Sequence, residues 1–202
     1  MDKRKVILAG IIFLFIFFIG GVVAYFTSTQ TVTNTFTIGN IQITLTEPAW
    51  VTTDSDNNGV PDAAQGKMPG QTVAKNPTIT NTGDNAAFIF AEVQVPCTDD
   101  GSLELFTYTV NSGWYTMSNG SCASTNGQMV ATKRYAYGTS SAMTSVAKTG
   151  TAVLFNEVTV NGSITGNEQG ISGNKQVVVT AYAIQADGLG SATDPTTVWA
   201  KF

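Results

Sequence analysis

The amino-acid sequence predicts an all-β protein: a jelly-roll-like two-sheet sandwich preceded by an N-terminal hydrophobic signal helix. After residue 24 the chain is rich in Thr and Val, whose branched Cβ atoms pack well on a pleated sheet. Apolar residues there recur with period two in short segments, and Gly, Asn and Ser separate these segments. About eight to ten strands of this kind are typical of a two-sheet sandwich.

The N-terminus has the three parts of a secretory signal. Lys3-Arg4-Lys5 is basic, the run from Val6 to Ile19 is apolar, and Val22-Val23-Ala24 supplies small residues for a signal peptidase. We expect cleavage between Ala24 and Tyr25, so that 1–24 is a signal peptide and 25–202 is a single secreted domain. The alternative is a retained membrane anchor, because the 21 residues from Val6 to Phe26 are enough to span ~30 Å of hydrocarbon as a helix.

Alternation of apolar and polar residues predicts the strands in order along the mature chain. They are expected at 25–38, 41–46, 78–84 (ending in a turn), 86–95, 106–110, 114–117, 128–137, 151–160 and 175–185. The segments 106–110 and 114–117 flank Asn111-Ser112-Gly113 and are expected to form a hairpin. Residues 177–184 are apolar on both faces, which predicts a central strand. Residues 52–70 are expected to form a long loop, and 186–202 a helical turn or a final edge strand.

The charge balance argues against nucleic acid as a partner. The chain has 10 basic and 14 acidic residues, and the leader removes Lys3, Arg4 and Lys5 but only one acidic residue, Asp2. Nucleic acids and anionic membranes both require clustered cations, so neither is expected to bind the mature chain. Contact with a membrane is expected only through the leader before cleavage. Charged residues make up only 12% of the chain, as is typical of extracellular β proteins.

Cys97 and Cys122 are the only cysteines. In an exported chain an even pair predicts a disulfide, and closing a loop of about 25 residues stabilises by roughly 3 kcal/mol. Two free or buried thiols are the alternative.

The segment 54–62 has the pattern of the first part of a calcium loop. Side-chain oxygens alternate along it, Gly59 permits a sharp turn, and a backbone carbonyl follows. The closing glutamate is absent, and Gln65 stands in its place. A structural Ca²⁺ that orders the loop is the only cofactor expected, and a solvated turn cluster is the alternative. The predicted ligands are Asp54, Asp56, Asn58, Val60 and Asp62.

Several segments together resemble the TasA/camelysin family of secreted biofilm-matrix fibre subunits. The resemblance covers the leader, both ends of the mature chain and much of its first half, while 97–150 looks like an insertion. The segments are 20–27 (GGVVAYFT), 34–41 (NTFTIGNI), 45–50 (LTEPAW), 69–70 (PG), 75–77 (KNP), 81–83 (NTG) and 181–186 (AYAIQA).

The resemblance implies a jelly-roll subunit that is processed by a signal peptidase of the SipW type and assembles into extracellular fibres or bundling pili. In such fibres each subunit receives an N-terminal strand from its neighbour. Here 25–38 suits the role of donor strand, because it is β-prone, nearly uncharged and free of proline. An ordinary first strand within its own sheet is the alternative. The donor side chains expected to fill the neighbour are Phe26, Val32, Phe36 and Ile38.

The camelysin branch of this family carries a metalloprotease label. This chain contains no histidine, which removes the usual imidazole ligands of catalytic zinc and the Ser-His-Asp arrangement. We therefore expect no enzymatic activity. The expected product is a homopolymer in the extracellular matrix or at the cell surface; a membrane-anchored monomeric binding module is the alternative function.

Overall fold

The computed structural model describes residues 39–168, 170–189 and 193–202. One compact unit spans Ile38–Phe202. The signal helix, the cleavage site at Ala24 and Tyr25, and the expected donor residues Phe26, Val32, Phe36 and Ile38 lie outside the described residues. Among the described residues, no helix has the length and hydropathy needed to cross a membrane.

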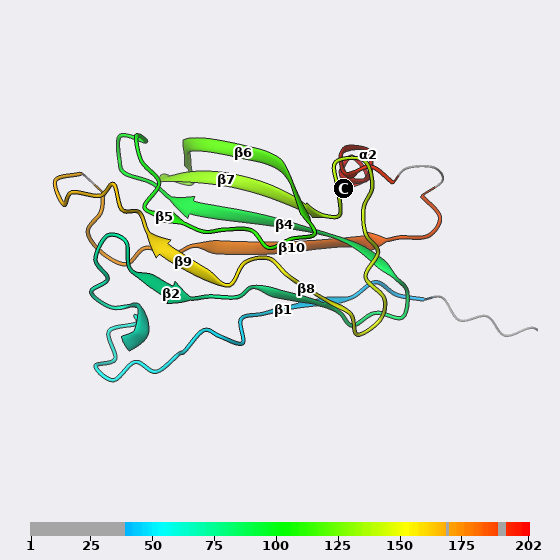
Figure 1. Ribbon diagram of the computed structural model, residues 1–202, viewed down its shortest axis with the longest axis horizontal. Helices are drawn as coiled ribbons and strands as arrows, with labels where there is room; N and C mark the ends of the chain where they lie inside the picture. Colours follow the sequence, from blue (N-terminus) through cyan, green and yellow to red (C-terminus); the bar gives the residue numbers. More distant parts are fainter. Residues whose placement is uncertain (1–38, 169, 190–192) are drawn as a thin grey trace, which may run out of the picture. The chain divides into compact units, whose positions relative to one another are not determined.

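One layer of the protein is a four-stranded antiparallel sheet in the order β10-β4-β7-β6 (Figure 1). Its centre is apolar because β4 is almost completely buried along its length. Strand β6 pairs with β7 through two register shifts, which mark β-bulges. The strands are β4 (Ala87–Pro96), β6 (Trp114–Thr125), β7 (Gln128–Tyr137) and β10 (Val178–Gln185).

The second layer consists of two three-stranded antiparallel sheets, β1-β3-β8 and β2-β9-β5. Segment 72–81 contributes β2 to one sheet and β3 to the other, and segment 151–160 likewise contributes β9 and β8. Residues 75–77 and 154–156 interrupt these segments. The backbone stays paired across the interruption, since Lys75 donates to Asn156 O (3.1 Å) and Leu154 donates to Pro77 O (2.9 Å). The strands are β1 (Ile43–Thr46), β2 (Thr72–Ala74), β3 (Thr78–Asn81), β5 (Phe106–Thr107), β8 (Thr151–Val153) and β9 (Glu157–Val160), and a 3-10 turn, η1 (Asp62–Ala64), lies in the loop between β1 and β2.

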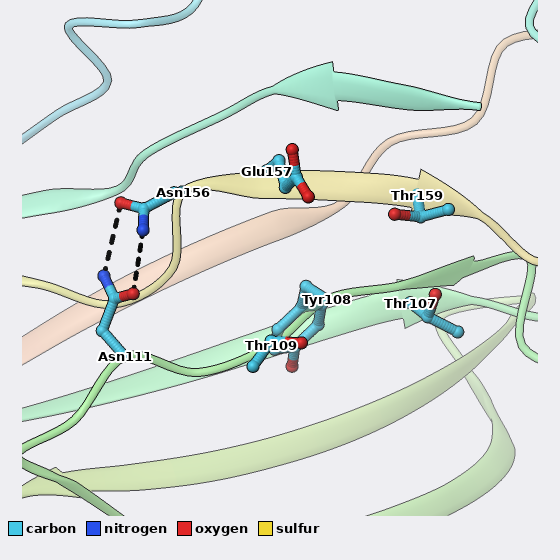
Figure 2. Close-up of a pocket in the computed structure, with 7 residues that line it drawn as sticks. All are labelled: Thr107, Tyr108, Thr109, Asn111, Asn156, Glu157 and Thr159. Carbon is cyan, nitrogen blue, oxygen red and sulfur yellow. Dashed lines mark hydrogen bonds between the residues drawn. The ribbon is translucent and has the colours of Figure 1, made fainter. Parts of the chain in front are cut away.

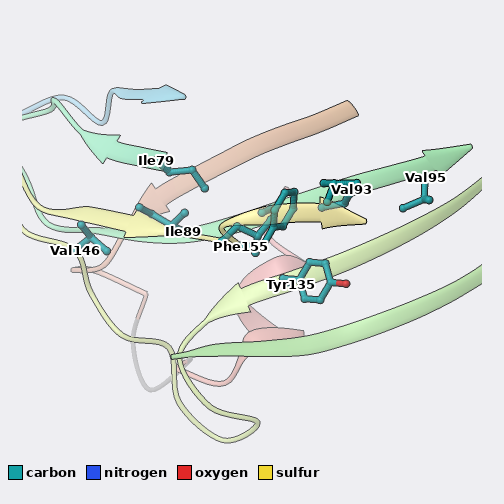
Figure 3. Packing of buried hydrophobic residues seen from close by; sticks show 10 residues of the cluster. Ile79, Ile89, Val93, Val95, Tyr135, Val146 and Phe155 are labelled. Atoms are coloured by element: carbon teal, nitrogen blue, oxygen red, sulfur yellow. The ribbon is translucent and has the colours of Figure 1, made fainter. Parts of the chain in front are cut away.

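The main hydrophobic core draws side chains from both layers, which makes the fold a β-sandwich of the all-β class that the sequence predicts. Figure 3 shows seven of these side chains labelled, with Ile79 on β3 and Ile89, Val93 and Val95 on β4. The cluster comprises Ile79, Ile89, Ala91, Val93, Val95, Tyr135, Val146, Leu154, Phe155 and Val158.

A short helix, α2 (Pro195–Trp199), covers part of the outer face of the four-stranded sheet. Asp194 caps it by accepting a hydrogen bond from Thr197 N at 2.9 Å, and Pro195 opens it. Val198 is fully buried against Phe90 and its neighbours. The helical turn expected in 186–202 is therefore present.

Two pairing predictions were wrong. Segments 106–110 and 114–117 do not form a hairpin, because β5 pairs with β9 and β6 pairs with β7. The strand with two apolar faces, β10, lies at an edge of its sheet among the described residues rather than at the centre. Its outer face is apolar because Tyr182 and Ile184 pack in the cluster that also contains α2.

Candidate functional site

The first candidate site is the side of β10 that faces away from β4. No strand of the described part of the chain pairs there. Val179 and Ala181 point to the interior opposite Val93 and Ala91, yet they are only half-buried, whereas Val93 and Ala91 are 0% exposed. The described residues therefore cover the interior side chains of β10 incompletely on the side of the strand that faces away from β4.

Strand β1, at the edge of the other layer, has the same property. Its Cα atoms approach those of β10 within 8 Å, and among the described strands it pairs only with β3. Leu45 lies opposite Ile79, and because directly opposite residues share a face, it points to the interior. Leu45 is nevertheless 36% exposed, while Ile79 is fully buried. We call β1 and β10, with these partly covered interior side chains, the open edge.

The second candidate site is the loop between β1 and η1, where Asp54, Asp56 and Asp62 offer carboxylate oxygens that all lie within 4.8 Å of one another. Asp54 accepts from Gly59 N at 2.8 Å, and Gly59 has φ +82°, a left-handed conformation that favours glycine. The sharp turn at this glycine thus brings the start and the middle of the loop together, as the sequence pattern predicts.

The other two predicted ligands also belong to this cluster. Asn58 Oδ1 accepts from Val60 N at 2.8 Å, and the carbonyl oxygen of Val60 accepts from Gln65 Nε2 at 2.9 Å. Gln65 Nε2 donates to Asp56 Oδ1 as well, at 3.1 Å. The amide of Gln65 thus joins two of the oxygens expected to bind a cation. The sequence pattern placed Gln65 at the closing position of the loop but did not reveal this bridging role.

The donor set fits a hard cation, because three carboxylates, an amide oxygen and a backbone carbonyl are the ligand types that Ca²⁺ prefers. Ser55 hydroxyl donates to Asp62 Oδ2 at 2.6 Å and Ser55 N donates to Asp62 Oδ1 at 2.9 Å. These bonds, the hydroxyl first, lower the pKa of Asp62 below its usual value. The carboxylate is therefore ionised throughout the neutral range and available to a metal.

The predicted disulfide is confirmed, since Cys97 and Cys122 are joined with a Cα–Cα distance of 6.1 Å. Cys97 directly follows β4 and Cys122 lies in β6. These two strands are not neighbours, because β7 lies between them. The disulfide thus ties together the two strands that flank β7.

A polar hollow of about 490 Å³ opens between β9 and the segment that continues β5 (Figure 2). Asn111 and Asn156 close one end with reciprocal amide hydrogen bonds of 3.0 and 3.4 Å. Glu157 is the only carboxylate of the lining. Burial, followed by the neighbouring Tyr135, raises the pKa of Tyr108, so its phenol remains protonated.

Comparison with protein-family models, curated proteins and solved structures found no match to this chain.

Proposed function

We propose that this protein is a secreted, non-enzymatic structural subunit that polymerises head-to-tail by donor-strand exchange. In the polymer, residues 25–38 of one copy add to the open edge of the next. The observation that carries the proposal is the partial exposure of interior-facing side chains at this edge, Leu45 on β1 and Val179 and Ala181 on β10.

An added strand would satisfy two needs of the open edge at once. An edge strand presents unpaired backbone N–H and C=O groups, which an extended segment can bond. The alternating apolar residues of the donor, Phe26, Val32, Phe36 and Ile38, would cover the half-buried interior side chains. A segment given to a neighbour in this way makes a heterologous contact, which propagates into a filament.

The expected route to the polymer is export followed by cleavage after Ala24 by a signal peptidase of the SipW type. Cleavage would release the donor segment from the membrane, so processing would act as the switch for assembly. The disulfide between Cys97 and Cys122 supports export, because such bonds persist in oxidising compartments. The proposed location is the extracellular matrix or the cell surface, and the proposed partner is another copy of the same chain.

We also propose that the loop 54–62 holds a structural Ca²⁺ through Asp54, Asp56, Asp62, Asn58 Oδ1 and the carbonyl of Val60. The ion would replace the hydrogen bonds that Gln65 makes to Asp56 and Val60, and it would screen the mutual repulsion of three carboxylates. Its role would be to order the loop, not to catalyse a reaction.

Two measurements on the extracellular protein test the polymer proposal. Intact mass is expected to show a chain that begins at Tyr25, and negative-stain microscopy is expected to show filaments. Leu45→Lys places a charge at the open edge and is expected to abolish filaments while the subunit stays folded. Val51→Lys, at a loop residue that is 53% exposed, is the matched control and should leave the filaments intact. A folded protein that keeps its N-terminal apolar run and forms no filaments would instead support the membrane-anchored monomer.

A further inference from the structure

The first described residues, 39–42, pack tightly against the turn formed by residues 81–85. We call this contact between the two segments the joint. Three consecutive backbone amides of the turn donate to the entering segment. Thr82 N and Gly83 N donate to Gln42 O at 2.8 and 2.9 Å, and Asp84 N donates to Asn40 O at 3.1 Å. Asp84 N also approaches Asn40 Oδ1 at 3.2 Å. The entering segment is thus bonded to the body before β1 begins.

Glycine is required on the turn side of the joint for close approach. A Cβ atom at Gly83 would lie 2.6 Å from Asn40 O and 2.7 Å from Gln42 N, so the two backbones would have to separate. A Cβ atom at Gly39 would meet only the side chain of Asn85, which is exposed and can move aside. The joint is therefore a backbone-to-backbone contact with little room to move.

A buried asparagine holds the turn side of the joint. Asn81 is 0% exposed, and its side chain uses both amide hydrogens and its oxygen. Nδ2 donates to Asn85 O and to Val146 O, each at 2.8 Å, and Oδ1 accepts from Gly83 N at 3.0 Å. Because a buried polar side chain with every bond made fixes its neighbours in one arrangement, the turn is rigidly tied to the body.

The far end of β1 is fastened as well. Glu47 pairs with Lys75 at 2.6 Å, and Ala49 N donates to Asn76 Oδ1 at 2.6 Å. Strand β1 is thus held at both ends and belongs to the body. The compact unit begins at Ile38, which places the boundary between body and preceding segment at the joint.

We propose that the joint fixes the direction in which the preceding segment leaves the body, and thereby sets the angle between successive subunits in the polymer. This inference rests on the proposed function. Since residues 25–38 would be inserted in the next copy, the joint is the only covalent connection between a subunit body and the strand that it donates. A rigid joint transmits the orientation of the inserted strand to the body, whereas a loose one would leave the angle undetermined.

The test compares two insertions in the full secreted chain. Gly-Ser-Gly inserted between Ile38 and Gly39 leaves every contact of the joint in place but uncouples it from the donated segment. The same insertion between Gly173 and Asn174, both exposed, is the control. Cryo-electron microscopy is expected to show filaments for both insertion variants. The rotation between successive subunits should match the wild type in the control and should vary broadly in the variant with the insertion after Ile38. A narrow wild-type twist after the insertion at Ile38 would overturn the inference.

Hydrogen exchange in the unassembled chain tests the rigidity of the joint separately. The amides of Thr82, Gly83 and Asp84 are expected to exchange slowly in the wild type and in Gly162→Ala, where a Cβ has open space, and quickly in Gly83→Ala. Fast exchange in the wild type would overturn the joint as a rigid element. A processed wild-type protein that forms no filaments would overturn the proposed function and the role of the joint in a polymer, whatever the exchange rates.

Discussion

Removal of the disulfide is expected to destabilise the body by an amount that follows from its place in the chain. The bond joins residues with a sequence separation of 25. In the chain-entropy model, a disulfide that closes a loop of this length stabilises the folded protein by about 3.5 kcal/mol at 25 °C, and removing the bond loses that amount. For a chain of this size each kcal/mol corresponds to about 2–4 °C, so the double variant Cys97→Ala/Cys122→Ala should melt about 7–14 °C lower.

The assay is thermal and guanidinium unfolding of the processed chain, followed by circular dichroism. Wild-type protein in reductant should lose the same stability as the double variant, and reductant should not affect the variant. The comparison separates the lost cross-link from lost packing, because Cys97 is only 4% exposed and alanine there removes a buried sulfur. A loss below about 1 kcal/mol in both samples would refute the entropic reasoning. It would mean that this loop already stays compact in the unfolded chain without the bond.

Three further predictions concern single residues. Millimolar Ca²⁺ is expected to raise the melting temperature of the wild type but not of Asp56→Ala, and calorimetry is expected to detect binding heat only in the wild type. No heat in the wild type, or equal heats in both proteins, would dismiss the site. Asn81→Ala removes the three hydrogen bonds of a buried side chain and takes away the donor to Asn85 O, while Gly83 N still donates to Gln42 O and Val146 O still accepts from Ala87 N. The variant should lose about 1–3 kcal/mol in guanidinium unfolding, and a cost within error would show that the turn does not depend on Asn81. Hydrogen bonds from the Thr98 hydroxyl, and then from Ser102, lower the pKa of Asp100 to about 2. The stability that the ionised Asp100 contributes is therefore fully present above the usual carboxyl pKa and is lost as the pH falls from about 4 to about 2. NMR titration should give the low pKa, and an ordinary carboxyl pKa would contradict these hydrogen bonds.

Local patterns in the sequence located strands well but did not reveal their partners. Strand-favouring residues between turn signals identified β7 and most of β4, because these signals belong to each strand by itself. The pairing of β5 with β9 joins segments far apart in the chain, so a turn signal at Asn111-Ser112-Gly113 suggested the wrong neighbour. The position of β10 could not be inferred because its outer apolar face is covered by α2, not by another sheet.

In the candidate sites too, the sequence revealed local features but not those that depend on contacts between distant segments. Spacing alone brought Asp54, Asp56 and Asp62 together, since a loop of that length with a glycine turn has few ways to close. The open edge could not be inferred, because it depends on which strands end each sheet and on how much of Leu45 and Ala181 the rest of the fold covers. The joint was equally hidden, since the need for Gly83 arises from a contact with Asn40 across the turn.

The most direct measurement of the central claim is a cryo-electron microscopy map of the extracellular filament at a resolution that traces the backbone. We predict a strand formed by residues 25–38 beside β10, continuous with the body of an adjacent subunit and with Phe36 over the interior side chains of the open edge. A map in which that strand connects to the same subunit, or in which the side of β10 away from β4 stays unpaired, would contradict the account.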